Sequence, residues 1–164
     1  MTVRTIARRW AACLAALMLF AAPFANAAEP INTLEKKGFF SWKPNGIAIR
    51  GYDTVAYWTE GKPVKGSADF VTEYMGATWR FASQENLDLF LGDADYYAPQ
   101  YGGYCAYGIA AQDALVKIEP ENWSIYDDKL YLNYNDGIQS SWEGDIPGFI
   151  ATADAKFEQL LKTE

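Results

Sequence analysis

The sequence predicts a small α+β domain in which short antiparallel hairpins pack with a few helices. β-Prone segments at 69–74 and 77–81 flank Met75-Gly76, and a second pair at 123–126 and 130–134 flanks two aspartates. Apolar residues from Ile146 to Leu161 recur at helical spacing, which predicts an amphipathic C-terminal helix. No internal repeat and no linker-like stretch is apparent after residue 28, so we expect a single domain.

The first 27 residues have the pattern of an export signal. Three arginines precede an apolar run over 10–24 that is too short to span a bilayer, and Ala25-Asn26-Ala27 supplies the small residues of a cleavage site. We therefore expect a Sec-type signal peptide over 1–27, an N-terminal arm over 28–45 and the folded domain over 46–164. This predicts a periplasmic or secreted bacterial protein with no membrane span after cleavage.

The charge of the chain limits its partners. Without residues 1–27 it keeps 11 Lys and Arg against 21 Asp and Glu, a net charge of −10. Such a surface repels phosphate backbones, so nucleic acid is not an expected partner. Small ligands, metal ions or an envelope protein remain as candidate partners, although an acidic balance also serves solubility alone.

Several local signals predict the order of elements. Ile47–Ile49 is an apolar strand candidate, and Asp53 is placed to cap a short helix that runs through Tyr57. Ser83 caps a helix over 84–91, whose core-facing residues are expected to be Leu87, Phe90 and Leu91. A strand is expected over 114–118, a helix from Ile138 onward, and Pro147 in the first turn of the last amphipathic segment.

The most unusual stretch is 96–107, YYAPQYGGYCAY, which holds five tyrosines, two adjacent glycines and the single cysteine that remains outside 1–27. Aromatic faces and hydroxyl groups suit a pocket for an apolar or cationic ligand, but the same residues also suit a half-buried core. Asp53 is interpreted as a helix cap rather than a general base. The candidate ligand-binding residues are Tyr52, Asp53, Tyr57, Tyr101, Gly102, Gly103, Tyr104 and Tyr107.

Donor atoms for metals are scarce. The chain has no histidine, so a Cys/His zinc site, a Ser/His/Asp triad and a Cys/His nucleophile are excluded within one chain. Cys105 and Met75 are the candidate metal ligands, with copper as the candidate ion because Cu(I) prefers sulfur. Two alternatives stay open: Cys105 is buried and inert or exposed and reactive, and Met75 is a ligand or a turn residue.

Four segments together resemble a known family: GYDTVAYWTEGKPVKGSADF, YMGATWRFAS, YYAPQYGGYCAYG and NWSIYDDKLYLNY. In this order they are similar to the exported bacterial YHS domain-containing proteins, over roughly residues 46–160. The resemblance implies a small α+β domain, related to a wider group that binds heavy metals through several cysteines. It does not imply an enzyme, and this chain has only Cys105 of that cysteine set.

Three functional hypotheses follow from the sequence. The first is a non-catalytic periplasmic binding or accessory protein for a metal ion or small ligand at the YGGYC loop. The second is a structural or interaction module of the cell envelope that binds no metal. The third is a thiol or redox enzyme, which requires an exposed Cys105 with a lowered pKa.

Overall fold

The computed structural model describes residues 28–37 and 41–163. The predicted signal peptide over 1–27 lies outside the described residues, as do residues 38–40 of the predicted arm. The strands are β1 (Leu34–Lys37), β2 (Ser41–Pro44), β3 (Tyr52–Asp53), β4 (Val64–Lys65), β5 (Ser67–Tyr74), β6 (Ala77–Phe81), β7 (Trp123–Tyr126) and β8 (Lys129–Leu132). The helices are η1 (Ala48–Gly51), α1 (Ala56–Thr59), α2 (Gln84–Gly92), α3 (Ala94–Tyr97), η2 (Gln100–Gly103), α4 (Ala106–Gln112), α5 (Asp136–Glu143) and α6 (Ile146–Thr163), of which η1 and η2 are 3-10 turns.

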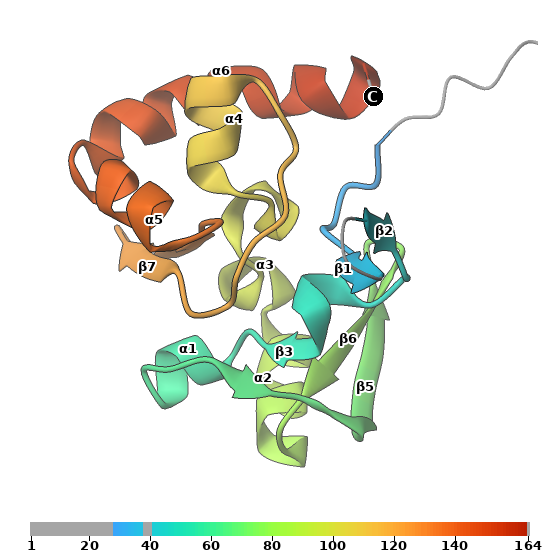
Figure 1. Ribbon diagram of the computed structural model, residues 1–164. Coiled ribbons are helices and arrows are strands. Elements are labelled where there is room, and N and C mark those ends of the chain that lie inside the picture. Colours follow the sequence, from blue (N-terminus) through green and yellow to red (C-terminus); the bar gives the residue numbers. More distant parts are fainter. Residues whose placement is uncertain (1–27, 38–40, 164) are drawn as a thin grey trace, which may run out of the picture.

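The predicted α+β class is confirmed. In the described part of the chain, consecutive strands pair as four antiparallel two-stranded sheets, β1–β2, β3–β4, β5–β6 and β7–β8. Helices α4, α5 and α6 lie together at one end of the molecule, and the β5–β6 hairpin with α2 lies at the other (Figure 1). The core follows this division. One buried cluster surrounds Trp79, Phe81 and Phe90, and a second surrounds Ile109, Trp142 and Ala153.

Both predicted hairpins are confirmed, since their turns are encoded locally. Met75 and Gly76 join β5 to β6 with φ values of 48° and 79°. Asp127 and Asp128 join β7 to β8 with φ values of 50° and 53°, the left-handed backbone that a two-residue hairpin turn requires. The predicted Ser83 cap is also confirmed, because its side chain accepts a hydrogen bond from Asn86 N at 3.1 Å at the start of α2.

Two predicted strands are wrong. Of Ile47–Ile49, Ile47 makes an isolated bridge with Thr78, and the chain then turns left-handed through η1. Residues 114–118 form no strand, because their backbone meets the start of a helix instead: Val116 O accepts from Cys105 N at 3.0 Å. In both places apolar residues such as Ile49 and Ile118 are buried although the segment does not form a strand.

The helical predictions need two corrections. Leu91 was expected to face the core with Leu87 and Phe90, but its side chain is 61% exposed. The C-terminal region forms two helices, α5 and α6, where one continuing from Ile138 was expected, and Asp145 precedes the second. Its Oδ1 accepts from Gly148 N at 3.1 Å, which places Pro147 in the first turn of α6 as predicted.

The predicted N-terminal arm is part of the packed structure. Ile31, Asn32 and Thr33 are each 2% exposed, and the chain continues into the β1–β2 hairpin, which the sequence analysis did not predict. Its start also contacts the last helix, since Ala28 N donates to Leu161 O at 3.1 Å. The arm therefore joins the YGGYC region to the end of α6.

Candidate functional site

The YGGYC loop begins with three successive residues in the left-handed backbone region. Tyr101, Gly102 and Gly103 have φ values of 57°, 60° and 77°, and Tyr104 N then donates to Tyr101 O at 3.1 Å. Left-handed backbone is costly for a residue that carries a Cβ, so Tyr101 is a strained position. Such strain persists only where surrounding contacts impose it.

The same turn occurs a second time, at η1. Ile49, Arg50 and Gly51 have φ values of 49°, 55° and 72°, and Tyr52 N closes the turn on Ile49 O. Each turn continues as Gly-Tyr followed by a polar residue and a helix: Asp53 before α1 and Cys105 before α4. No internal repeat is apparent in the sequence, yet the backbone forms the same left-handed turn at η1 and at η2.

Asn32 links the two turns. Its N donates to Gly102 O at 2.8 Å, its side-chain amide donates to Gly103 O at 2.9 Å, and its O accepts from Ile49 N at 3.0 Å. The glycines allow this packing: a Cβ at Gly102 would lie 1.9 Å from Pro30 O, and one at Gly103 would lie 2.2 Å from Ile49 Cδ1. The close approach that Gly102 and Gly103 permit is therefore used by the protein's own chain on this side.

Asp53 is a structural anchor. Its side chain is fully buried, and its Oδ1 accepts from Val55 N at 2.9 Å and Ala56 N at 3.2 Å. Its Oδ2 accepts from Ala82 N at 2.8 Å and from the Asn86 side-chain amide at 2.7 Å. Four donors and complete burial leave this carboxylate no surface for a ligand. The predicted cap is displaced: Val55 is the N-cap of α1, and Asp53 instead bonds the turn that leads into the helix.

Cys105 occupies the matching place after the second turn. The residue is 1% exposed, its Sγ accepts from Gly108 N at 3.3 Å, and its thiol donates to Asn133 Oδ1 at 3.6 Å. Burial raises the pKa of the Cys105 thiol, and the N–H groups of Gly108, Tyr134 and Tyr107 oppose that rise. Of the two alternatives for the thiol, the structure shows the buried one.

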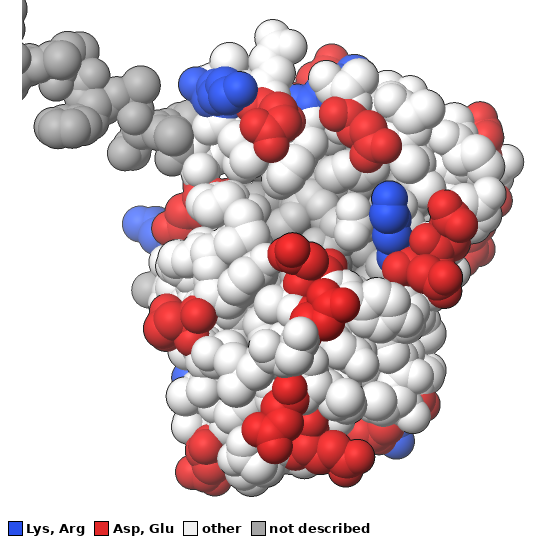
Figure 2. All heavy atoms as spheres, turned by 180° about the vertical axis from the view of Figure 1, so that it is seen from behind, with Lys and Arg blue, Asp and Glu red and all other residues white. Residues whose placement is uncertain are grey.

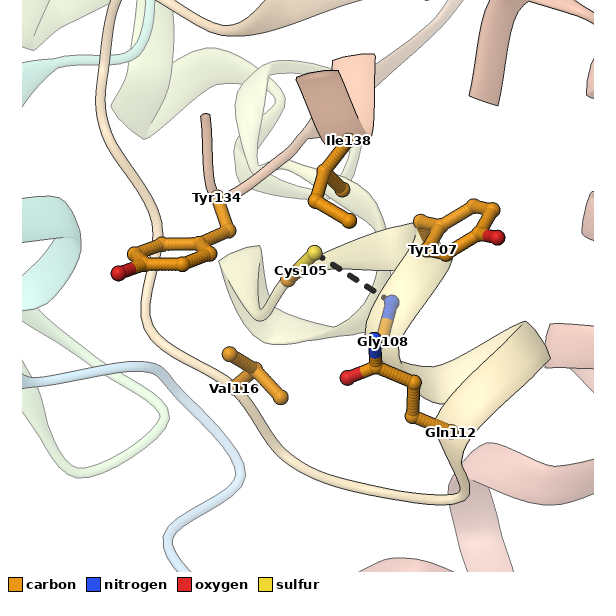
Figure 3. Close-up of a pocket in the computed structure, with 7 residues that line it drawn as sticks. All are labelled: Cys105, Tyr107, Gly108, Gln112, Val116, Tyr134 and Ile138. Atoms are coloured by element: carbon orange, nitrogen blue, oxygen red, sulfur yellow. Dashed lines mark hydrogen bonds between the residues drawn. The ribbon is translucent and has the colours of Figure 1, made fainter. Parts of the chain in front are cut away.

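A small pocket adjoins the sulfur. The side chains that line it surround Cys105 from α4, from the segment before β7 and from the start of α5 (Figure 3). The volume open to the centre of a water molecule is about 20 Å³, room for about one water. The lining residues are Cys105, Tyr107, Gly108, Gln112, Val116, Tyr134 and Ile138.

Three of the predicted tyrosines, Tyr57, Tyr104 and Tyr107, make contacts within the protein. Tyr57 is 1% exposed and donates to Pro120 O at 2.9 Å, and burial raises the pKa of its phenol. Tyr104 donates to Glu29 O at 3.0 Å, and the Tyr107 ring lies 5.0 Å from that of Phe149. These contacts assign the three residues to the core and to the docking of the N-terminal segment.

A larger cavity lies against Tyr101 and Gly102. It is about 210 Å³ in the same measure and brings these two predicted residues together with Met75, at the tip of the β5–β6 hairpin. We call it the Tyr101 cavity; its lining residues are Pro30, Ile31, Tyr74, Met75, Asp95, Ala98, Pro99, Gln100, Tyr101, Gly102, Phe157, Glu158 and Leu161. Met75 is 53% exposed, and Cys105 lines the other pocket, so the two sulfur atoms do not share a cavity.

The Tyr101 cavity has an acidic character. Asp95 and Glu158 line it, and no Lys or Arg is among its described lining residues. The Tyr101 hydroxyl donates to Asp154 Oδ1 at 2.8 Å, and burial followed by this bond raises the pKa of the phenol. The Tyr74 hydroxyl donates to Asp95, a contact that, with burial, raises its pKa to about 12. Both phenols are therefore neutral donors at pH 7.

The two acidic residues of this cavity, Asp95 and Glu158, were not predicted as site residues. Glu158 lies on the polar side of α6, where a sequence offers no signal that separates a lining residue from a solvated one. Asp95 caps nothing, and its neighbour Asp93 accepts from Tyr96 N at 3.1 Å at the start of α3. Within the described residues, no group of three or more Cys, Asp and Glu side chains is arranged to hold a metal ion.

Comparisons with known proteins support the resemblance. The family model of the YHS domain matches residues 55–101, from the start of α1 to the left-handed turn at Tyr101. No curated protein and no solved structure matches the chain. None of the helices in the described ranges is both long enough and apolar enough to cross a bilayer. The match identifies residues 55–101 as similar to the YHS domain, and together with the α+β architecture it is consistent with a YHS domain-containing protein.

Proposed function

We propose that the protein is a non-catalytic binding protein of the bacterial cell envelope that holds a small ligand with a positively charged group in the Tyr101 cavity. The observation that carries the proposal is the convergence of Tyr101, Gly102 and Met75 on a cavity whose described charged lining is Asp95 and Glu158. An aromatic ring, a thioether and two carboxylates are a suitable set for an organic cation.

The strained turn supports a binding role for this cavity. Tyr101 holds a left-handed backbone, and its ring packs 5.6 Å from that of Phe157 while its hydroxyl bonds Asp154 on the same helix. These two contacts hold one wall of the cavity in a backbone conformation that costs about 1–2 kcal/mol. Preformed walls reduce the entropy that a ligand loses on binding.

The acidic lining favours a cation over an anion. Glu158 pairs weakly with Lys162, since the two side chains are 79% and 73% exposed and 3.9 Å apart. Asp95 accepts the Tyr74 hydroxyl with one oxygen, which leaves the other for a ligand. On the face of the molecule that Figure 2 shows, acidic side chains outnumber basic ones, in keeping with the acidic balance of the chain.

A titration with defined organic cations tests the proposal. The purified protein is titrated with tetramethylammonium and with benzylamine, and amide shifts of Gly102 and Met75 are followed by NMR. We expect saturable binding that weakens about threefold to tenfold in Glu158→Gln and in Asp95→Asn, in proportion to the lost charge. Glu85→Gln, on the exposed start of α2, is the matched control and should bind as the wild type does.

A Cu(I) titration separates the metal hypothesis from the organic ligand. Met75 supplies a soft donor at this cavity, so Cu(I) binding that is lost in Met75→Leu and kept in Cys105→Ala places a metal at the same site. Binding of Cu(I) that depends on Cys105 places it elsewhere, and the absence of any saturable cation binding contradicts the proposal. The thiol-enzyme hypothesis requires an exposed Cys105 with a lowered pKa, whereas Cys105 is buried and its pKa is raised.

The envelope location is tested separately. N-terminal sequencing of the exported protein should give Ala28 as the first residue, because Ala25 and Ala27 satisfy the small-residue positions of the cleavage site. Recovery of the full-length chain from the cytosol contradicts this part of the proposal and leaves the cation titration unaffected.

A further inference from the structure

A group of cations gathers around the first left-handed turn of this acidic chain. Arg50 lies in η1, Lys65 in β4 and Arg80 in β6, and β3 and β4 pair Tyr52 with Lys65. Arg50 has a carboxylate partner, Glu119. Neither Lys65 nor Arg80 has a carboxylate oxygen within 4.0 Å among the residues that the structure describes.

The two unpaired cations face the same small area of backbone. An ideal Cβ at Gly51 would lie 3.5 Å from Arg80 Cδ, 3.5 Å from Ile47 Cγ2 and 3.8 Å from Lys65 Nζ, so both cationic side chains approach this glycine. The Lys65 ammonium also lies 4.5 Å from the Tyr52 ring centroid and donates to Arg50 O. Tyr52, a predicted ligand-binding residue outside the Tyr101 cavity, therefore belongs to this cluster.

The cluster has unused donors. Arg80 Nε and Arg50 Nε are buried and have no hydrogen-bond partner. A buried N–H without an acceptor costs about 1–3 kcal/mol, so an acceptor at this place would be stabilising. A guanidinium also presents its donors as a fork that fits the oxygens of a tetrahedral oxoanion.

The electrostatics of Lys65 point in the same direction. Burial lowers the pKa of its ammonium, and Arg50 and Arg80 lower it further, whereas Glu35 and Glu121 raise it. The positive charges therefore repel one another in the absence of an anion. The chain as a whole has more acidic than basic residues, so the repulsion between these cations arises from their closeness to one another and not from the net charge.

We propose that Lys65 and Arg80 bind a small oxoanion of the phosphate class beside Gly51 and Tyr52, at a site separate from the Tyr101 cavity. The anion would be held by the Arg80 fork and by the ammonium of Lys65, with Arg50 adding positive potential behind them. The site depends on the first left-handed turn, because that turn presents the Arg50 carbonyl to Lys65 and places Gly51 between the two cations.

The proposal is tested by titrating the purified protein with inorganic phosphate at low ionic strength, following the amide shifts of Gly51 and Gly66 by NMR. Sulfate and phenyl phosphate form parallel arms, which separate a free oxoanion from a phosphate monoester, and sodium chloride at equal ionic strength is the salt control. We expect saturation with phosphate, at least about tenfold weaker binding in Lys65→Met and Arg80→Met, and no saturation with chloride.

Lys129→Met is the matched control, since Lys129 is an exposed cation of the β7–β8 hairpin and its loss changes the net charge equally. Arg80→Lys keeps the charge but removes the fork, so it should bind more weakly than the wild type and serves if Arg80→Met does not fold. Equal weakening by Lys129→Met and Lys65→Met, or equal shifts with chloride and phosphate, would overturn the proposal.

Discussion

The two left-handed turns share a backbone but differ in the residue that follows them. After the first turn, Asp53 accepts from the N–H groups two and three residues ahead and from Ala82 N, the residue before the Ser83 cap. After the second, the sulfur of Cys105 faces the N–H groups two and three residues ahead and that of Tyr134, the residue before the Asn135 cap. The N–H groups at these corresponding positions surround a carboxylate in one copy and a thiol in the other. Gly108 N donates to the sulfur at 3.3 Å, whereas Tyr107 N donates to Asn133 Oδ1 at 3.1 Å.

The surroundings of Asp53 are fully occupied by donors, whereas those of Cys105 include a small pocket. The Asp53 oxygens also accept from the Asn86 side chain. At the corresponding position of the second copy, three residues after the cap, Ile138 lines the small pocket beside Cys105. A thiol accepts weaker hydrogen bonds than a carboxylate, so we expect the first copy to contribute more to stability.

The largest effect should come from removing the first acceptor. Asp53→Ala removes the acceptor of four donors, three of them in buried bonds, and we expect the free energy of unfolding to fall by about 3–5 kcal/mol in urea denaturation. Asp88→Ala, at an exposed position of α2, should change it by less than about 0.5 kcal/mol. If Asp53→Ala does not fold, Asp53→Asn serves, and a loss below about 1 kcal/mol in either variant would contradict the anchoring role.

The next effect concerns the contact between the turns. Gly103→Ala places a Cβ 2.2 Å from Ile49 Cδ1 in a left-handed backbone, and we expect a loss of about 3 kcal/mol or more by thermal or urea unfolding. The matched control is Gly76→Ala, where φ is 79° and no atom lies within 4 Å of the new Cβ, so backbone strain alone costs about 1 kcal/mol. Equal losses in the two variants would show that the turns do not press on each other.

The smallest effect is that of the thiol. We expect Cys105→Ala to lower the free energy of unfolding by about 1–2 kcal/mol at pH 7. Because burial raises the pKa of the folded thiol, its contribution is complete below the unfolded pKa of about 8.5 and is lost as pH rises through the folded value. The difference between wild type and Cys105→Ala should therefore shrink at alkaline pH, since the tyrosines are common to both. A difference that grows with pH would mean that the sulfur is held as a thiolate.

Predictions that rested on local chemistry were confirmed. Ser83 caps α2 because its side chain needs only the N–H three residues ahead, and Met75-Gly76 and Asp127-Asp128 form turns because adjacent residues suffice to close them. Of the tyrosine-rich stretch, Tyr101 and Gly102 line a cavity. Whether that cavity binds a ligand stays a prediction.

Predictions that needed distant partners failed. Ile47–Ile49 has the composition of a strand, but Asn32 and Gly103 impose a left-handed turn on Ile49 from 17 and 54 residues away. Leu91 fits the helical spacing of Leu87 and Phe90, yet α2 is oriented so that Asn86 reaches Asp53 and Leu91 faces solvent. In both cases the prediction failed because the structure depends on a contact between residues that are far apart in the sequence.

The α+β class, the two predicted hairpins, the Ser83 cap and the lack of imidazole chemistry could all be deduced from residue types and from neighbours within a few positions. The burial of Cys105, the placement of Met75 beside Tyr101 and apart from Cys105, and the lack of carboxylate partners for Lys65 and Arg80 among the described residues became evident from the folded chain alone. These properties arise from long-range packing, in which Asn32 joins two strained turns, and burial and charge pairing are set by that packing rather than by local preference.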